Sequence, residues 1–299
     1  MNRPDGLARC LDALLGGTAL PAEIIVVDQG EGDAAHEVVR CRCNPRVPIV
    51  YVPQRNRGLS ASRNAAAARA RSEILAVTDD DCVPHRGWIA AVSHAFVAAP
   101  EPDAVTGRVL ALGPARPGLY AISLRTSTEP ADFIEATMPW HVGTGANFAA
   151  RRSCLLGAGG YDERLGAGSP GLAAEDLELS YRLLRAGARI RYEPAAIVYH
   201  ERHSPARRLA TRWSYGHGIG ATCGMLWIRG DSRYAVTVLW RWLSGRALRV
   251  VKSVLGRDMN SARQAIWSIS GTVTGFTYGW RIERTRTRLD NGPRKARCA

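Results

Sequence analysis

The sequence lacks any uncharged apolar run of about 18 residues, the length that a membrane-crossing helix needs. It also shows no signal peptide, because residues 1–5 lead straight into a helical pattern. The seven cysteines have no paired metal spacing: Cys41 and Cys43 are too close together for a zinc knuckle, and no second pair matches them. These absences predict a cytoplasmic protein with reduced thiols and no transmembrane helix.

The first two thirds of the chain have no net positive charge, whereas the last third is strongly basic. The chain has a net charge of +13, but residues 1–201 carry −2 and residues 202–299 carry +15, with 19 Lys and Arg against four Asp and Glu. No known nucleic-acid-binding motif accompanies this basic segment, so nucleic acid is not an expected partner. The segment also holds six of the eight tryptophans: Trp213, Trp227, Trp240, Trp242, Trp267 and Trp280.

Interleaved arginine and tryptophan on helices suits the interface of an anionic membrane. The alternative is a set of helices packed on the rest of the protein, with a solvated basic face. We expect peripheral association with the inner face of the cell membrane.

Apolar segments alternate between helical and extended patterns along the first two thirds of the chain. This order predicts an α/β fold with a mostly parallel sheet flanked by helices. No strand precedes the first helix, although such a sheet normally begins with one; either the start lies further upstream or the sheet lacks a strand. The pattern predicts helices over 4–15, 33–39, 58–70, 84–98, 173–186 and, with interruptions, 205–288, and strands over 23–28, 47–52, 74–79, 104–112, 146–150, 189–192 and 196–200.

Three acids, Asp79, Asp80 and Asp81, follow the apolar run 74–77. Ligands of open α/β sheets bind at the carboxyl ends of strands. Three neighbouring carboxylates repel one another, and a hard cation such as Mg²⁺ or Mn²⁺, which also binds phosphates, relieves that repulsion. The alternative is a solvated acidic turn that caps the next helix.

Seven short motifs follow one another along the chain: 23–28, Arg55-Asn56-Arg57-Gly58 with 61–64, 78–81, 143–148 with Arg151-Arg152, 159–163, Glu175-Asp176 and His200. Their order resembles family 2 glycosyltransferases of the GT-A fold, over roughly residues 2–215. The resemblance implies transfer of a sugar from a nucleoside-diphosphate sugar to a hydroxyl acceptor, with inversion at the anomeric carbon, in the synthesis of a cell-surface polysaccharide or glycolipid.

The resemblance also implies a division of the chain. Residues 1–203 are the catalytic domain, with a nucleotide-sugar half over about 1–112 and an acceptor half over about 113–203. Residues 204–299 are a basic, Trp-rich helical extension.

Five residues are expected to line the nucleotide-sugar. The resemblance implies that the Asp28 carboxylate accepts a hydrogen bond from a ring N–H of uracil or thymine, which favours UDP- or dTDP-sugars. Asn56, Gly58 and Arg63 are expected beside the nucleotide, with Arg63 near phosphate, and Asn147 at the floor of the site. The alternatives are ordinary turn and helix-start roles. Family members often have two acids where this chain has Asp28-Gln29.

The metal site is expected at the acidic turn. The resemblance implies that Asp79 faces ribose and metal, that Asp81 ligates Mg²⁺ or Mn²⁺, and that His200 reaches the metal or the diphosphate. Asp80 is the variable middle residue, grouped with the nucleotide-sugar contacts but expected to point away from the metal. A structural role for His200 is the alternative.

Glu175 and Asp176 begin a strongly amphipathic helix, where acids are favourable to the helix dipole without any further role. The resemblance assigns Asp176 as the base that removes the proton of the acceptor hydroxyl, which a carboxylate does best when its surroundings raise its pKa. Glu175 is then expected to contact the acceptor, a glycan or a lipid-linked sugar.

A second interpretation is a catalytically inactive GT-A domain that binds sugar-nucleotides or acts as a scaffold. The missing first strand favours this interpretation. The presence of Asp79, Asp81 and Asp176 opposes it.

Overall fold

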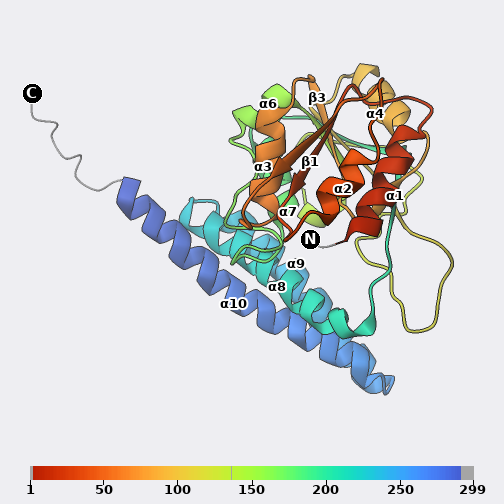
Figure 1. Cartoon of the computed structure of the whole chain (residues 1–299). Helices are drawn as coiled ribbons and strands as arrows, with labels where there is room; N and C mark the ends of the chain where they lie inside the picture. The colour runs from red at the N-terminus through yellow and green to blue at the C-terminus, as the bar shows by residue number, and fades with distance from the viewer. Residues whose placement is uncertain (1–2, 136, 291–299) are drawn as a thin grey trace, which may run out of the picture. The chain divides into compact units, whose positions relative to one another are not determined.

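The computed structural model describes residues 3–135 and 137–290 (Figure 1). It divides into two compact units. The first, here called the α/β unit, comprises Met1–Glu163 and Glu175–Pro205; the second, the helical unit, comprises Arg164–Ala174 and Ala206–Ala299. The segment Arg164–Ala174 therefore groups with the C-terminal helices, which the sequence pattern did not indicate.

The strands of the α/β unit form two sheets. β1 and β2 make a two-stranded sheet, and the larger sheet has the order β3-β7-β5-β8-β4, with β6 also paired to β8. The strands are β1 (Ile24–Asp28), β2 (Ile49–Pro53), β3 (Ile74–Val77), β4 (Cys82–Pro84), β5 (Ala104–Ala111), β6 (Ala131–Phe133), β7 (Phe148–Arg151) and β8 (Ile190–His200).

The direction of the strands is mixed. Among the described residues, the pairs β1–β2 and β5–β8 are parallel, whereas β7 runs antiparallel to β3 and β5, and β4 and β6 run antiparallel to β8. The expected α/β class with flanking helices is confirmed, but the expectation of a mostly parallel sheet is wrong. The first three residues of β7 are apolar and buried although β7 runs antiparallel to both of its neighbours, so a continuous apolar run does not reveal strand direction here.

Seven helices of the α/β unit are described, and the first illustrates how sequence fixes them. Pro4 lies in the first turn of α1, where its missing N–H has no helical partner to lose, and Leu11 and Leu14 point from one face into the core. The helices are α1 (Pro4–Leu15), α2 (Ala34–Arg40), α3 (Leu59–Arg69), α4 (Trp88–Val97), α5 (Pro139–Val142), α6 (Arg152–Gly157) and α7 (Glu175–Arg185).

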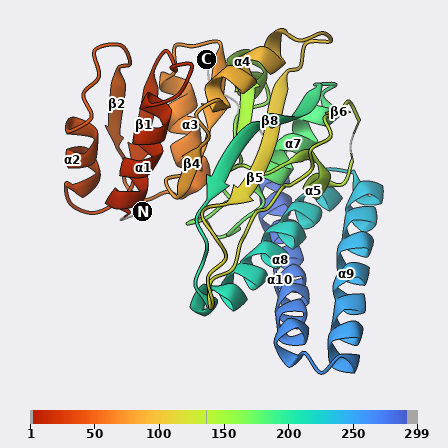
Figure 2. The same ribbon diagram turned by 90° about the vertical axis from the view of Figure 1, so that its right-hand side faces the viewer.

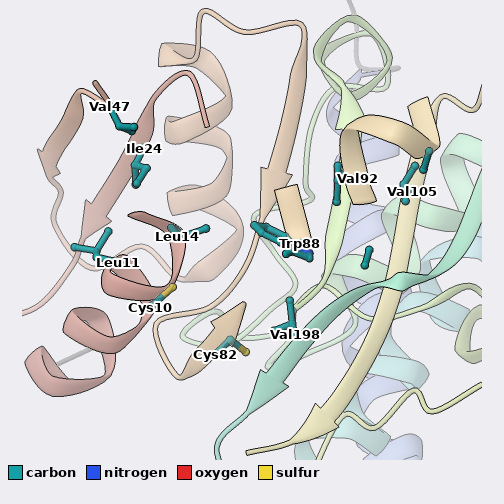
Figure 3. Close-up of a cluster of buried hydrophobic side chains, with 14 of the residues drawn as sticks. Cys10, Leu11, Leu14, Ile24, Val47, Cys82, Trp88, Val92, Val105 and Val198 are labelled. Atoms are coloured by element: carbon teal, nitrogen blue, oxygen red, sulfur yellow. The ribbon is translucent and has the colours of Figure 1, made fainter. Parts of the chain in front are cut away.

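One buried cluster joins several of these elements. Figure 3 shows Leu11 and Leu14 of α1 and Ile24 of β1 on one side of it, with Val105 of β5 and Val198 of β8 on the other. This shared core holds the acidic turn between β3 and β4 against the rest of the unit.

The helix expected from residue 84 begins instead at Trp88. Residues Cys82–Pro84 form the short strand β4, which pairs antiparallel with the end of β8 so that Cys82 lies opposite His200. The pairing joins residues more than 100 positions apart, so the local pattern could not show it.

β1 and β3 each have one edge without a strand partner among the described residues. β1 pairs with β2 and β3 pairs with β7, each on one side. Ala76, in the middle of β3, is exposed.

The helical unit consists of α8 (Pro205–Ile228), α9 (Ser232–Leu255), α10 (Met259–Asp290) and the segment Arg164–Ala174. Within it, Leu165 is fully buried against α8, and Arg164 forms an ion pair of 2.8 Å with Glu283 of α10. In the described part of the chain, no helix has both the length and the hydropathy that a membrane crossing requires.

Two rows of glycines bring α8 and α10 together. Each row has a glycine every fourth residue, which places all three on one face of its helix. A Cβ atom at Gly275 would lie 1.9 Å from the carbonyl oxygen of His217, and one at Gly220 would lie 2.1 Å from that of Thr272. The two backbones are therefore in direct contact along the rows Gly216, Gly220, Gly224 and Gly271, Gly275, Gly279.

Candidate active site

The acidic turn after β3 meets the end of β8. Because Cys82 of β4 pairs with His200, the carboxylates of Asp79 and Asp81 lie close to the His200 ring. One ligand atom from each of Asp79, Asp81, Cys82 and His200 lies within 4.8 Å of the others. The structure thus brings together the three residues that the sequence suggested as metal ligands.

The chemistry of this cluster fits a divalent cation. His200 Nδ1 lies 2.9 Å from the carbonyl oxygen of Glu201, which can only accept, so Nδ1 donates a hydrogen bond to it. The other ring nitrogen, Nε2, faces Asp81 Oδ1 at 3.7 Å. The two carboxylates are suitable ligands for Mg²⁺ or Mn²⁺, and the imidazole adds a nitrogen donor.

Cys82 is the weakest of the four donors. Burial raises the pKa of its thiol, and the negative charges of Asp79 and Asp81 raise it further. A protonated thiol is a poor ligand for a hard cation. Asp79, Asp81 and His200 are therefore the better set.

His203 was not recognised from the sequence, although its spacing from His200 is a usable signal. Its Nε2 lies 3.9 Å from Asp81 Oδ2. Two backbone hydrogen bonds with Tyr120, of 2.9 and 3.0 Å, fix its position. His203 is a further imidazole at the same carboxylate.

Arg3 was also missed. Its guanidinium donates a hydrogen bond to Asp81 Oδ2 and lies 3.5 Å from Asp80 Oδ1. Asp80 therefore faces this arginine. Burial raises the pKa of Asp80, and Arg3 opposes that rise.

Arg63 links the acidic turn to the start of α7. Its buried guanidinium donates to Glu175 Oε1 at 2.9 Å, to Asp79 Oδ1 at 2.8 Å and to the carbonyl oxygen of Gly145 at 3.2 Å. The side chain is engaged by protein acids here. Its expected contact with phosphate stays a prediction.

Glu175 and Asp176 begin α7 beside this arginine. Asp176 Oδ2 accepts the N–H of Gly145 at 2.7 Å, and its Oδ1 accepts the N–H of Leu177 at 2.8 Å. Burial raises the pKa of both carboxyls; the Asp176 charge adds to the rise at Glu175, and the Gly145 hydrogen bond opposes it at Asp176. Glu175 is buried and ion-paired, whereas Asp176 is partly exposed and better placed to meet a substrate.

Asn147 corrects one prediction. Its side chain is 2% exposed; Oδ1 accepts from Trp88 Nε1, and Nδ2 donates to the carbonyl oxygens of Arg108 and Ala196, each at 2.8 Å. Both N–H donors and one lone pair of the amide oxygen are used inside the protein. Asn147 therefore holds β5, β8 and α4 together and does not present its side chain to a nucleotide-sugar.

The residues expected to face the nucleotide lie at the carboxyl end of β1 and just before the start of α3. Asp28 accepts hydrogen bonds from Gly30 N–H and Tyr51 Oη, both at 2.8 Å. The Gln29 amide, which replaces the second acid of the motif, binds both the N–H and the carbonyl of Gly58, and Asn56 Oδ1 also accepts from that N–H. Roles for Asp28, Asn56 and Gly58 toward a nucleotide stay predictions.

Family models match most of the chain. The model described as glycosyl transferase family 2 matches residues 1–155, and the model described as glycosyl transferase family group 2 matches residues 79–281. Together they include the acidic turn, Glu175, Asp176 and His200.

Curated relatives agree with these matches. A pre-mycofactocin glycosyltransferase of Mycobacterium tuberculosis is 29% identical over 254 residues, which is 83% of this chain and 49% of that protein. A glucosyl-dolichyl phosphate glucuronosyltransferase of Haloferax volcanii is 24% identical over 219 residues, 67% of this chain and 66% of that protein. The chain spans about half the length of the first of these relatives.

Solved structures show the same fold. The mannosyltransferase PcManGT from Pyrobaculum calidifontis, in complex with GDP-Man and Mn²⁺, has a TM-score of 0.60 at 16% identity and covers 92% of this chain and 84% of its own. Residues 1–349 of S. aureus TarS, in complex with UDP, have a TM-score of 0.52 at 13% identity and cover 96% of this chain and 89% of their own. With the family models matching over half of its residues, the chain belongs to glycosyltransferase family 2.

Proposed function

We propose that the chain transfers a sugar from a nucleoside-diphosphate sugar to a hydroxyl acceptor, with inversion at the anomeric carbon. One observation carries this proposal: Arg63 joins a metal-competent acidic turn, through Asp79, to the buried Glu175, which adjoins the partly exposed Asp176. A cation site for a diphosphate and a carboxylate with a raised pKa are the two components that such a displacement requires.

Asp79, Asp81 and His200 would hold Mg²⁺ or Mn²⁺ on the donor side. When bound, the cation supplies positive charge against the leaving nucleoside diphosphate. Arg63 keeps Asp79 in place from the other side of the turn and so orients the site before substrate arrives.

Asp176 would act on the acceptor side. The acceptor oxygen attacks the anomeric carbon as the bond from that carbon to the diphosphate breaks, and the hydroxyl proton passes to the Asp176 carboxylate. The Gly145 N–H fixes the orientation of that carboxylate. The ion pair with Arg63 holds the Glu175 carboxylate, and so its negative charge, next to Asp176.

We propose the donor and the acceptor as chemical classes only. Asp28 favours a uracil or thymine base, and UDP in the TarS structure supports this choice, whereas GDP-Man in PcManGT offers a guanine alternative. The acceptor is a glycan or a lipid-linked sugar; the dolichyl phosphate in the name of the Haloferax relative supports the second.

Asp81→Ala is expected to abolish the dependence of donor binding on a divalent cation. Isothermal titration calorimetry with UDP and with dTDP should show tighter binding to the wild type with Mn²⁺ or Mg²⁺ than without. In the variant the two conditions should give equal affinities, because the more buried of the two carboxylate ligands is gone.

Asp12→Ala is the matched control. Asp12 is an exposed residue of α1 that pairs with Arg42, and such surface ion pairs contribute little to stability. A wild type that binds UDP, dTDP and GDP equally with and without metal would rule out the metal site. Metal-dependent binding with neither transfer nor hydrolysis of any donor would instead support the inactive, sugar-nucleotide-binding alternative.

The acid limb of the pH–rate profile is expected to lie above the ordinary aspartate pKa of about 3.9. Only the carboxylate of the base accepts a proton, so activity rises with pH through its pKa, and burial raises that pKa. Arg63→Gln removes the positive charge that lowers the pKa of Glu175 and Asp176, so the limb should move up by about 1–3 units.

Arg63→Lys is the control, since it keeps the charge and should leave the limb near its wild-type position. The position of the limb does not depend on the fraction of active protein, so partial loss of folding does not obscure it. If the acid limb does not shift in Arg63→Gln, the charge of Arg63 does not influence the pKa of the base.

A further inference from the structure

Helix α9 has a packed face and an open apolar face. On the packed face Ala235 and Val238 are buried, and Trp242 Nε1 donates to Thr272 Oγ1 of α10 at 3.0 Å. Figure 2 shows α9 alongside α10. The packing against α10 therefore accounts for one side of the helix only.

The opposite side carries a row of exposed apolar residues, here called the outer stripe. Trp240 is 72% exposed and Leu255 is 80% exposed. Successive members recur at helical spacing, so they share one face over most of a helix about 36 Å long. The outer stripe consists of Val236, Trp240, Ala247, Leu248, Val251, Val254 and Leu255.

The charge of α9 has one sign. Between Asp231 and Asp258 the chain has no acid, and the helix carries five basic residues: Arg233, Arg241, Arg246, Arg249 and Lys252. Arg241 and Lys252 are exposed, and on a helical wheel they lie beside the outer stripe. A partner for this face must accept apolar side chains and supply negative charge.

We infer that the outer stripe of α9 lies on the surface of an anionic lipid bilayer. An exposed tryptophan and long aliphatic side chains enter the boundary between headgroups and acyl chains, while flanking basic residues pair with lipid phosphates. A second copy of the chain fits less well, because it would bring two helices with five positive charges each into contact. The inference does not depend on sugar transfer.

Vesicle co-sedimentation of the full chain tests this inference. The wild type should bind vesicles of phosphatidylcholine and phosphatidylglycerol in equal parts, bind pure phosphatidylcholine much less, and be partly released by salt. Val251→Glu with Val254→Glu should weaken binding to the anionic vesicles at least about tenfold, because it places two acids in the stripe.

The control is Val97→Glu with Ile134→Glu, which makes the same charge change at two exposed positions of the α/β unit. It should bind nearly as well as the wild type. Equal loss in both variants, or no loss in the stripe variant, would overturn the inference.

Two further measurements decide the remaining outcomes. Arg241→Gln with Lys252→Gln leaves the apolar stripe intact and should weaken anionic binding several-fold, which covers the case in which the glutamate variant fails to fold. Light scattering reports self-association. A wild-type dimer that dissociates in the stripe variant, without vesicle binding by either, would assign the surface to a second copy and refute the bilayer.

Discussion

Asp176→Asn is expected to lower turnover about 10²–10⁴-fold while leaving donor affinity nearly unchanged. An amide keeps the shape of the side chain, and its oxygen can still accept the N–H of Gly145, but it cannot take the proton of the acceptor hydroxyl. Single-turnover assays with the true acceptor, beside calorimetry with the nucleoside diphosphate, separate the two quantities.

Asp12→Asn supplies the matched control at an exposed position and should be indistinguishable from the wild type. Glu175→Gln should behave differently from Asp176→Asn, because it removes one of the two carboxylate partners of the buried Arg63 guanidinium and should lower thermal stability as well as turnover. Wild-type turnover in Asp176→Asn would exclude this residue as the base.

Gly275→Ala is expected to destabilise the helical unit by about 1–3 kcal/mol or more. The added Cβ would lie 1.9 Å from the backbone oxygen of His217, and a backbone atom cannot rotate away as a side chain can. Helices α8 and α10 must then separate along the whole glycine row. Hydrogen exchange should rise in peptides from α8 and α10, and the melting temperature should fall.

Gly245→Ala is the control from the same unit. It lies within α9, where an added Cβ would meet nothing within 4 Å. Alanine is favoured over glycine inside a helix by about 0.5–1 kcal/mol, so this variant should be as stable as the wild type or slightly more so. Equal stability of Gly275→Ala and Gly245→Ala would mean that α8 and α10 are not in backbone contact.

The acidic turn and the start of α7 could be predicted because their signals are local. An apolar run that stops at three acids marks the end of a strand wherever that strand lies in the sheet. The motif order then supplied roles for Asp79, Asp81, Asp176 and His200. The structure adds that the first, second and fourth of these meet in one cluster.

The misses share a different cause: each depends on a contact between distant segments. Asn147 was assigned to substrate because the motif names it, but Trp88 and two carbonyls from β5 and β8 use its amide. Arg3 reaches Asp81 because the start of α1 lies against the acidic turn, and His203 reaches it because β4 pairs with the end of β8.

The glycine rows of α8 and α10 are visible in the sequence as glycines spaced four residues apart. Glycine is unfavourable inside a helix unless a partner needs the space, and the spacing alone does not identify that partner. Only the partner helix shows why the absence of a side chain is useful at these positions.

Arg3 makes cation binding at the acidic turn an exchange reaction. Its guanidinium already neutralises part of the charge of Asp81 and Asp80, so an incoming divalent ion replaces an existing ion pair instead of meeting bare carboxylates. The affinity measured for Mg²⁺ or Mn²⁺ is then a difference between two interactions. It understates how strongly the acids bind metal, and the protein can keep its acidic turn folded when a chelator removes the ion.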